Sequence, residues 1–269
     1  MYQLNKNYFP YFQYQKAQTN KSKGIIFFIH GYAVNSDYHN DFSNQLTNYD
    51  YYAVELPGHG ITPINKKYKF NTFGFAQAIV DLINKLDLKN IILIGHSMGG
   101  GIAIIVSHLI KSRIKKMILV TPMNSKGTTN FINFLFRFNP KTIKQADRFY
   151  QIILDTNNET SLAKISDQDK LNLINYHIKH KKVFRKLKYH LFSLKNLLTM
   201  LKYEKDINVE TLLIVGTNDG CINHSKTIKN LTTKNKNIKT YAFTNAGHVP
   251  FFEHPQKYYE IIMQFINNN

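Results

Sequence analysis

Short apolar runs, rich in β-branched residues, recur along the chain and indicate buried β-strands. Nearly every position in these runs is apolar, rather than every second one, which is typical of parallel strands covered on both faces. Six runs fit this description: residues 25–29, 51–55, 91–94, 117–120, 211–215 and 239–243. The first twenty residues are rich in tyrosine and phenylalanine, and we expect them to add one or two antiparallel edge strands.

Several segments between these runs have the spacing of amphipathic helices. Apolar residues recur three or four positions apart within 75–86, 102–109 and 258–265. Asn71 or Thr72 is available to cap the first of these helices. Strands that alternate with helices predict an α/β fold with a mainly parallel central sheet flanked by helices.

One long segment interrupts this alternation. Between Pro122 and Ile207 the sequence has only helical patterns. The clearest is a stripe of leucines, Leu187, Leu191, Leu194, Leu198 and Leu201. The segment is too long to be a loop of a compact domain. We therefore expect a core formed by residues 1–123 and 207–269, with a helical insertion formed by residues 124–206.

The chain is strongly basic, with 35 Lys and Arg residues against 17 Asp and Glu and a net charge of +18. Such a charge can attract nucleic acid or an anionic membrane surface. The lysines are spread over most segments and accompany abundant Asn and Ile and no Trp, which favours a compositional bias as their cause. We therefore expect no specific nucleic-acid partner.

Weak association with an anionic membrane stays open as a second hypothesis. Residues 179–202 place several cations beside the leucine stripe, so this segment could lie on anionic lipid. The alternative, which we favour, is that the stripe is the buried face of a helix in the insertion.

Other features of the sequence bear on location. No apolar run reaches the ~18–20 residues needed to span a bilayer, and the N-terminal residues lack the pattern of a signal peptide. A single cysteine, Cys221, excludes an internal disulfide. We expect a cytoplasmic protein, with peripheral contact to a membrane as the alternative.

The first chemical signal is the sequence GHSMG at 95–99, which directly follows the apolar run 91–94 and precedes a helical pattern. This is G-x-S-x-G between a strand and a helix, the setting in which a serine is held exposed on a sharp turn. An ordinary turn is the alternative interpretation of the pentapeptide alone. The flanking strand and helix favour Ser97 as a nucleophile.

A nucleophilic serine needs a base, and the base needs an acid that orients it. Asp219 follows the run 211–215, and His248 lies in a loop after the run 239–243, so both belong to the sheet edge where sites form. Each could instead be an ordinary turn or loop residue. The segment after 117–120 offers no carboxylate, which favours Asp219. The other histidines considered as the base are His30, His59, His96, His224 and His254.

These motifs together resemble the α/β-hydrolase superfamily over nearly the whole chain. Beside GHSMG, the matching segments are HGY at 30–32, LPGHGIT at 56–62, GTND at 216–219, GH at 247–248 and FFEHP at 251–255. Glu55 and Thr62 depart mildly from the family pattern, which usually has Asp and Ser there. The resemblance implies that the backbone N–H groups of Tyr32 and Met98 form the oxyanion hole.

The resemblance also implies that the insertion is a cap over the active site. Its apolar side chains that could line a pocket are Phe131, Phe134, Leu135, Phe136 and Phe138. For any single one of them, packing of the cap onto the core is the favoured role.

The predicted function is a serine hydrolase of esterase or lipase type, which cleaves a small carboxylic ester or lipid through an acyl-Ser97 intermediate. Asp219 and His248 complete the triad, and neither a metal nor an organic cofactor is expected. The alternatives are a prolyl-aminopeptidase-like or haloperoxidase-like enzyme, and a non-catalytic binding module of the same fold. The complete triad argues against the binding module.

Overall fold

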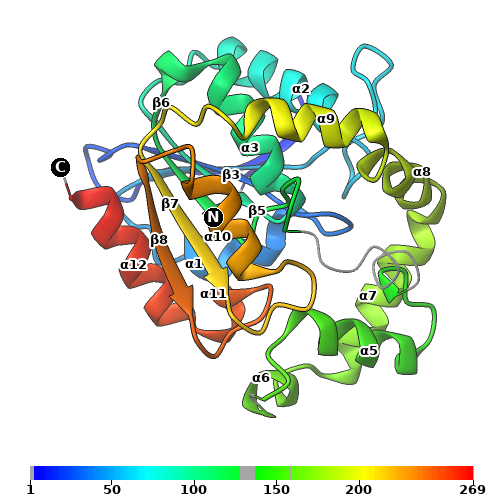
Figure 1. The fold of residues 1–269 in the computed structure, drawn as a ribbon. Helices are drawn as coiled ribbons and strands as arrows, with labels where there is room; N and C mark the ends of the chain where they lie inside the picture. Colours follow the sequence, from blue (N-terminus) through cyan, green and yellow to red (C-terminus); the bar gives the residue numbers. More distant parts are fainter. Residues whose placement is uncertain (1–2, 128–136, 158, 269) are drawn as a thin grey trace.

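A mixed, mostly parallel sheet of eight strands forms the centre of the molecule (Figure 1). The computed structural model describes residues 3–127, 137–157 and 159–268. The strands are β1 (Gln3–Asn5), β2 (Phe12–Gln15), β3 (Ile25–Ile29), β4 (Asp50–Val54), β5 (Ile91–His96), β6 (Ile114–Val120), β7 (Thr211–Gly216) and β8 (Ile238–Phe243). Their order in the sheet is β1-β2-β4-β3-β5-β6-β7-β8. Strands β3 to β8 run parallel, whereas β1 and β2 pair antiparallel at one edge, so the predicted fold class is confirmed.

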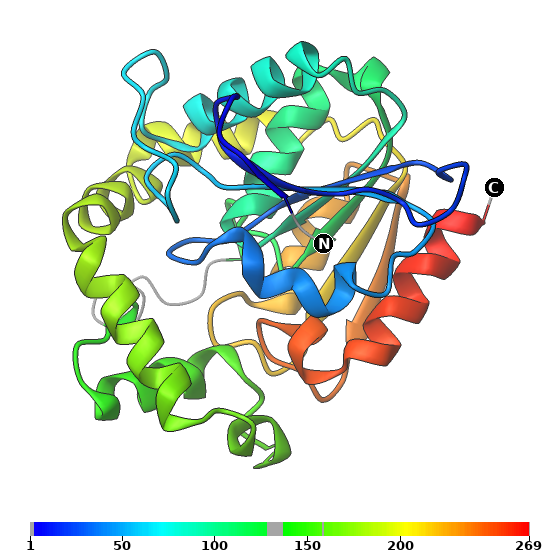
Figure 2. The same ribbon diagram turned by 180° about the vertical axis from the view of Figure 1, so that it is seen from behind.

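Helices cover both faces of the sheet, as Figures 1 and 2 show. One face carries α2 (Thr72–Lys85), α3 (Met98–Leu109) and α10 (His224–Thr232), and the other carries α1 (Asn40–Ser43) and α12 (Pro255–Asn267). The shorter elements are η1 (Ser36–His39), η2 (Lys111–Arg113) and α11 (Pro250–Glu253). Helix α2 is capped by Asn71, whose side chain accepts a hydrogen bond from the Gly74 N–H at 2.9 Å.

The alternation of side chains along each strand explains why the predicted runs are apolar throughout. Phe27 and Ile29 of β3 belong to the core cluster beneath α2 and α3. Ile26 and Phe28 of the same strand belong to the cluster beneath α1 and α12. Because successive side chains point to opposite faces, a strand covered on both faces needs apolar residues at every position.

Between β6 and β7 every secondary-structure element in the described part of the chain is a helix. These helices are α5 (Ile143–Ile153), α6 (Glu159–Ala163), α7 (Asp167–Lys179), α8 (Lys181–Leu191) and α9 (Leu194–Tyr203). Helices α5 to α8 lie to one side of the sheet, and α9 returns across α3 (Figure 1). No helix among the described residues is long and apolar enough to cross a membrane.

The predicted leucine stripe is divided between two helices. The chain breaks after α8, and Ser193 caps the new helix α9 by accepting from the Asn196 N–H at 3.2 Å. Leu187 and Leu191 of α8 are buried, whereas Leu194 and Leu198 of α9 are exposed. The stripe is therefore not one continuous buried face.

Strand β6 begins three residues before the predicted run. The prediction missed these residues because two of them, Lys115 and Lys116, interrupt the apolar pattern. Lys115 is exposed, but Lys116 is buried. The Lys116 ammonium group donates to the Phe265 carbonyl at 2.8 Å and to the Asn268 carbonyl, both at the C-terminal end of α12. Cations near a helix C-terminus are stabilising because they bind the last carbonyls and complement the helix dipole.

Lys116→Met is expected to lower the free energy of unfolding by about 1–3 kcal/mol, because the buried carbonyls of α12 lose their donor. Urea unfolding followed by circular dichroism measures this change. The matched control is Lys115→Met, which removes an exposed ammonium group and is expected to change stability by less than about 0.5 kcal/mol. Equal midpoints for the two variants would contradict the assigned role of Lys116.

Candidate active site

Ser97 lies on a sharp turn between β5 and α3, with backbone angles φ 53° and ψ −121°. A positive φ is strained for a residue with a side chain, and it is typical of functional turns. The turn requires glycine on both sides. A Cβ on Gly95 would lie 2.5 Å from the Gly99 carbonyl oxygen, and a Cβ on Gly99 would lie 2.2 Å from that of Ile29.

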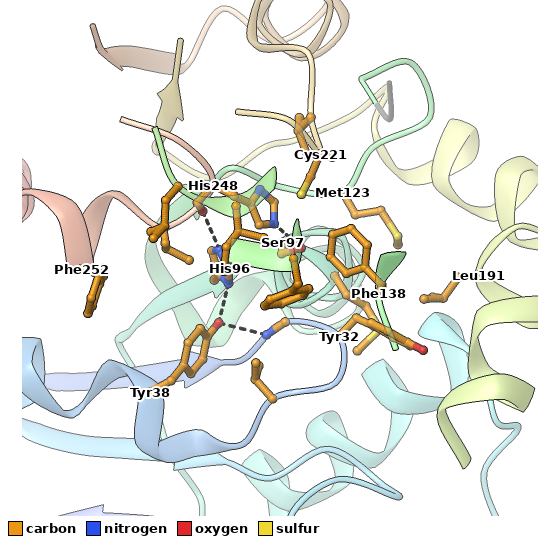
Figure 3. A pocket seen from close by; sticks show the side chains of 18 of the residues that line it. Tyr32, Tyr38, His96, Ser97, Met123, Phe138, Leu191, Cys221, His248 and Phe252 are labelled. Atoms are coloured by element: carbon orange, nitrogen blue, oxygen red, sulfur yellow. Dashed lines mark hydrogen bonds between the residues drawn. The ribbon is translucent and has the colours of Figure 1, made fainter. Parts of the chain in front are cut away.

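The structure brings the three predicted catalytic side chains together, and Figure 3 shows His248 beside Ser97. His248 Nε2 lies 2.8 Å from Ser97 Oγ, and His248 Nδ1 lies 2.8 Å from Asp219 Oδ2. The other carboxylate oxygen of Asp219 accepts from the N–H groups of Cys221 and Ile222 at 2.7 and 3.0 Å. The Asp219 side chain is 1% exposed, and these three hydrogen bonds fix its orientation.

The two predicted oxyanion residues line the same cavity as Ser97. Tyr32 follows β3, and Met98 is the first residue of α3, where backbone N–H groups have no partner within the helix. The Tyr32 hydroxyl donates to the Phe184 carbonyl of α8 at 3.0 Å, so the loop after β3 is tied to the insertion.

A buried hydrogen-bond chain connects the loops around Ser97 (Figure 3). His96 Nε2 lies 2.9 Å from the His248 carbonyl oxygen and must therefore carry the proton. His96 Nδ1 then accepts from the Tyr38 hydroxyl, which in turn accepts from the Gly31 N–H at 3.0 Å. Burial lowers the pKa of His96 well below its usual value and raises that of Tyr38, so both are neutral. The chain holds the loops after β3, β5 and β8 in one arrangement.

Glu253 fixes the loop that carries His248. Its carboxylate accepts from the Gly247 N–H at 2.7 Å and from the Asp155 N–H at 2.6 Å. The His248 N–H donates to the Ile153 carbonyl at 2.7 Å, and the Gly220 N–H donates to the Ile152 carbonyl at 3.2 Å. The end of α5 is therefore bonded to both the histidine loop and the loop that follows Asp219.

The other buried histidines near the site have structural partners. His30 Nε2 accepts from the Leu56 N–H at 3.0 Å, and burial lowers the pKa of His30 to about 4. His59 Nε2 accepts from the Ala33 N–H at 3.3 Å, and burial lowers its pKa well below the usual value. Neutral imidazoles that accept backbone hydrogen bonds brace the loop after β3 and are not free to act as bases.

Ser97 and His248 open onto a cavity of about 700 Å³ between the sheet edge and the helices of the insertion. Most of its wall is apolar, including Phe138, Phe149, Ile153, Leu173, Leu191, Leu197, Met200 and Phe252. Of the insertion residues predicted as pocket candidates, Phe138 lines the cavity, whereas Phe131, Phe134, Leu135 and Phe136 lie outside the described residues. A cavity of this size and character fits an apolar organic group next to Ser97.

One set of possible metal ligands occurs in the described part of the chain. Ligand atoms of Asp219, Cys221 and His248 lie within 4.8 Å of one another. Asp219 and His248 already bond each other, and burial, reinforced by Asp219, raises the pKa of the Cys221 thiol well above its usual value. A neutral thiol is a poor nucleophile, and the set has three ligands, of which two are bonded to each other.

Several positioning residues have no signal in the sequence. Tyr38 is one of 17 tyrosines and lies 58 positions before its partner His96. Glu253 lies within the FFEHP segment, so the motif marked its position but not its role. Cys221, the single cysteine of the chain, lines the cavity wall.

Comparison with known proteins places these observations in context. The family model described as alpha/beta hydrolase fold matches residues 24–255. A Mycoplasma genitalium protein named "Putative esterase/lipase 3" is 26% identical over 260 residues, which cover 95% of this chain and 91% of the relative. The pimeloyl-(acyl-carrier protein) methyl ester esterase of Wigglesworthia glossinidia brevipalpis is 30% identical over 256 residues, which cover 90% of this chain and 93% of the relative.

Solved structures are similar in fold. The crystal structure of a "putative lipase" from Acinetobacter baumannii AYE matches with a TM-score of 0.82 and 21% identity, covering 100% of this chain and 93% of that one. At this identity the likeness concerns the fold alone.

Tyr38→Phe is expected to lower the free energy of unfolding by about 1–3 kcal/mol, because His96 Nδ1 and the Gly31 N–H lose their shared buried partner. Urea unfolding gives the value. Tyr189→Phe, which removes an exposed hydroxyl, is the control and should leave the midpoint unchanged. If the two variants unfold at the same urea concentration, the Tyr38 hydroxyl does not hold the loops together.

Proposed function

The chain belongs to the α/β-hydrolase fold family, and we propose that it is a serine hydrolase that cleaves carboxylic esters. The observation that carries the proposal is the unbroken hydrogen-bond path from Asp219 through His248 to Ser97 Oγ, at the wall of an apolar cavity. The esterase and lipase names of its relatives support the same class of reaction.

His248 acts as the general base in this proposal. Its Nδ1–H donates to Asp219, which leaves Nε2 free of a proton and able to accept one from the Ser97 hydroxyl. Ser97 then attacks the ester carbonyl carbon while Asp219 stabilises the imidazolium. His248 returns the proton to the departing alcohol, and a water activated by the same imidazole hydrolyses the acyl-serine.

The backbone N–H groups of Tyr32 and Met98 are the proposed oxyanion donors. Both residues border the cavity beside Ser97, one at the end of β3 and the other at the N-terminus of α3. Donors fixed by the fold stabilise the tetrahedral oxyanion without reorganisation, and each such donor contributes about 3–4 kcal/mol.

We further propose that residues 1–123 and 207–269 are the catalytic core and that residues 124–206 are its cap. Two observations support this division. The triad residues all follow strands of the sheet, whereas α5, α7 and α9 supply much of the cavity wall. In this proposal the core supplies the reacting groups, and the cap determines the shape of the substrate pocket.

Ser97→Ala is expected to lower kcat for p-nitrophenyl butyrate by about 10⁴-fold or more, because the nucleophile is removed while the fold remains. The parent should also react with a fluorophosphonate probe, and Ser97→Ala should not. Unchanged circular dichroism of the variant is the control for folding. Equal rates in parent and variant would refute the assignment, and an unreactive parent would favour the binding-module alternative.

The apolar cavity generates a prediction about acyl-chain length. Each methylene buried contributes about 0.8 kcal/mol, so kcat/KM should rise severalfold per added methylene from acetate towards octanoate. Leu173→Trp, which fills part of the cavity, should shift the preference to shorter chains. Leu171→Trp is the matched control on the exposed side of α7 and should leave the preference unchanged.

The p-nitrophenyl esters from acetate to octanoate, assayed together with a prolyl amide, also distinguish an esterase from a prolyl-aminopeptidase-like enzyme. Cleavage of the amide in preference to every ester would favour an aminopeptidase. A flat response to acyl-chain length in the parent would contradict the cavity as the acyl site.

A further inference from the structure

We propose that the α8–α9 surface, meaning the exposed side chains of residues 181–202, docks on an anionic bilayer and presents the cavity to lipid esters held there. The inference extends the proposed function, because it names where the ester substrate is taken up. It rests on the charge of the surface, the faces of α9 and the position of that helix in the cavity wall.

Basic charge is concentrated on this part of the insertion. Residues 179–205 contain nine Lys and Arg residues and one acidic residue, Glu204, and so carry +8 of the chain's +18. Glu204 is buried and accepts from Ser125 and Asn230, so it does not neutralise the surface. The rest of the insertion, residues 124–178 and 206, holds seven basic and six acidic residues and carries a net charge of +1.

The exposed cations of α8 and α9 are available to an external partner. Within the described ranges of the chain, the salt bridges involve other residues. Lys195 and Lys202 lie seven positions apart on α9, and therefore on one side of that helix. A row of unneutralised cations favours contact with a negatively charged surface.

Helix α9 also exposes a stripe of apolar side chains beside these cations. Leu194 and Leu198 are 70% and 56% exposed, and their spacing of four residues places them on one face. Successive residues turn by about 100° around a helix, so this face is adjacent to the one that carries Lys195 and Lys202. An apolar stripe flanked by lysines is the pattern of a helix that lies in a membrane interface.

The opposite face of α9 is part of the cavity wall. Asn196 and Met200 are buried there and line the cavity. Leu197 lies between the two faces, lines the cavity and is 40% exposed, so it forms the cavity's edge on this side. One helix thus has a surface suited to lipid on its outer side and the proposed acyl site on its inner side.

Charge and apolar exposure together favour a bilayer over other acidic partners. A nucleic acid, or a protein surface made of acidic side chains alone, would satisfy the lysines but would leave Leu194 and Leu198 in water. Insertion of these side chains among lipid chains removes their apolar surface from water, while the lysines remain at the headgroups. The bilayer is the occupant that accounts for both features.

Vesicle co-sedimentation tests the proposal, with phosphatidylcholine vesicles compared with equal mixtures of phosphatidylcholine and phosphatidylglycerol. The protein should bind the mixed vesicles and dissociate at high salt. Each lysine near such a surface contributes about fivefold in affinity, so Lys195→Gln/Lys202→Gln should bind about 25-fold more weakly. Leu194→Asn/Leu198→Asn should weaken binding by about tenfold or more.

Matched controls separate this surface from general charge and hydrophobicity. Lys234→Gln/Lys236→Gln removes two exposed lysines elsewhere, and Ile61→Asn/Ile64→Asn removes two apolar side chains of comparable exposure. Both should bind vesicles as the parent does. Binding that is equal on neutral and anionic vesicles, or equally weakened by surface and control variants, would overturn the proposal.

Activity assays keep this test distinct from the test of the proposed function. Ser97→Ala should bind vesicles normally, whatever the reaction is. The Leu194 and Leu198 double variant should hydrolyse soluble p-nitrophenyl butyrate at the parent rate but a vesicle-embedded lipid ester about tenfold or more slowly. Salt-sensitive retention on duplex DNA without vesicle binding would assign the charge to another partner and overturn the membrane proposal.

Discussion

Close contact between the backbones of β3, β5 and α3 is the constraint on which the candidate site depends. Gly95 and Gly99 have no side chains, so helix α3 approaches the sheet more closely than any other residue would allow. That approach forces the intervening turn and its positive φ at Ser97. Packing of the helices on the sheet therefore holds the Ser97 hydroxyl exposed at the sheet edge. The two hydrophobic clusters stabilise the fold enough to offset the backbone strain at Ser97.

The side chains proposed to react are held by neighbours that have no role in the proposed chemistry. Tyr38 and His96 connect three loops, and Glu253 joins the Gly247 N–H of the histidine loop to the Asp155 N–H that follows α5. Because these partners are buried and satisfied, the imidazole has little freedom to leave its position between Ser97 and Asp219. Fixed dipoles and hydrogen bonds of this kind are what an ester hydrolase needs before its substrate arrives.

The sequence predicts most of the fold because a strand covered on two faces must be apolar at every position. The same rule fails at the start of β6, where Lys116 is buried but satisfied by distant carbonyls of α12. Motif and chain order identify Ser97, Asp219 and His248, because local turns fix each of them. Tyr38 escapes prediction because its role arises from contacts with residues far away in the chain. The leucine stripe does not form the single buried face that its spacing predicts, because Ser193 caps a new helix, α9, on which Leu194 and Leu198 face outwards.

The hydrogen bonds at the end of α5 limit how the helical insertion can move. Ile152 and Ile153 bond the loop that follows Asp219 and the loop that carries His248, so a rigid swing at this end would displace the proposed acid and base. A movement of the insertion that leaves Ser97, Asp219 and His248 in their hydrogen-bonded arrangement must therefore keep the end of α5 in place.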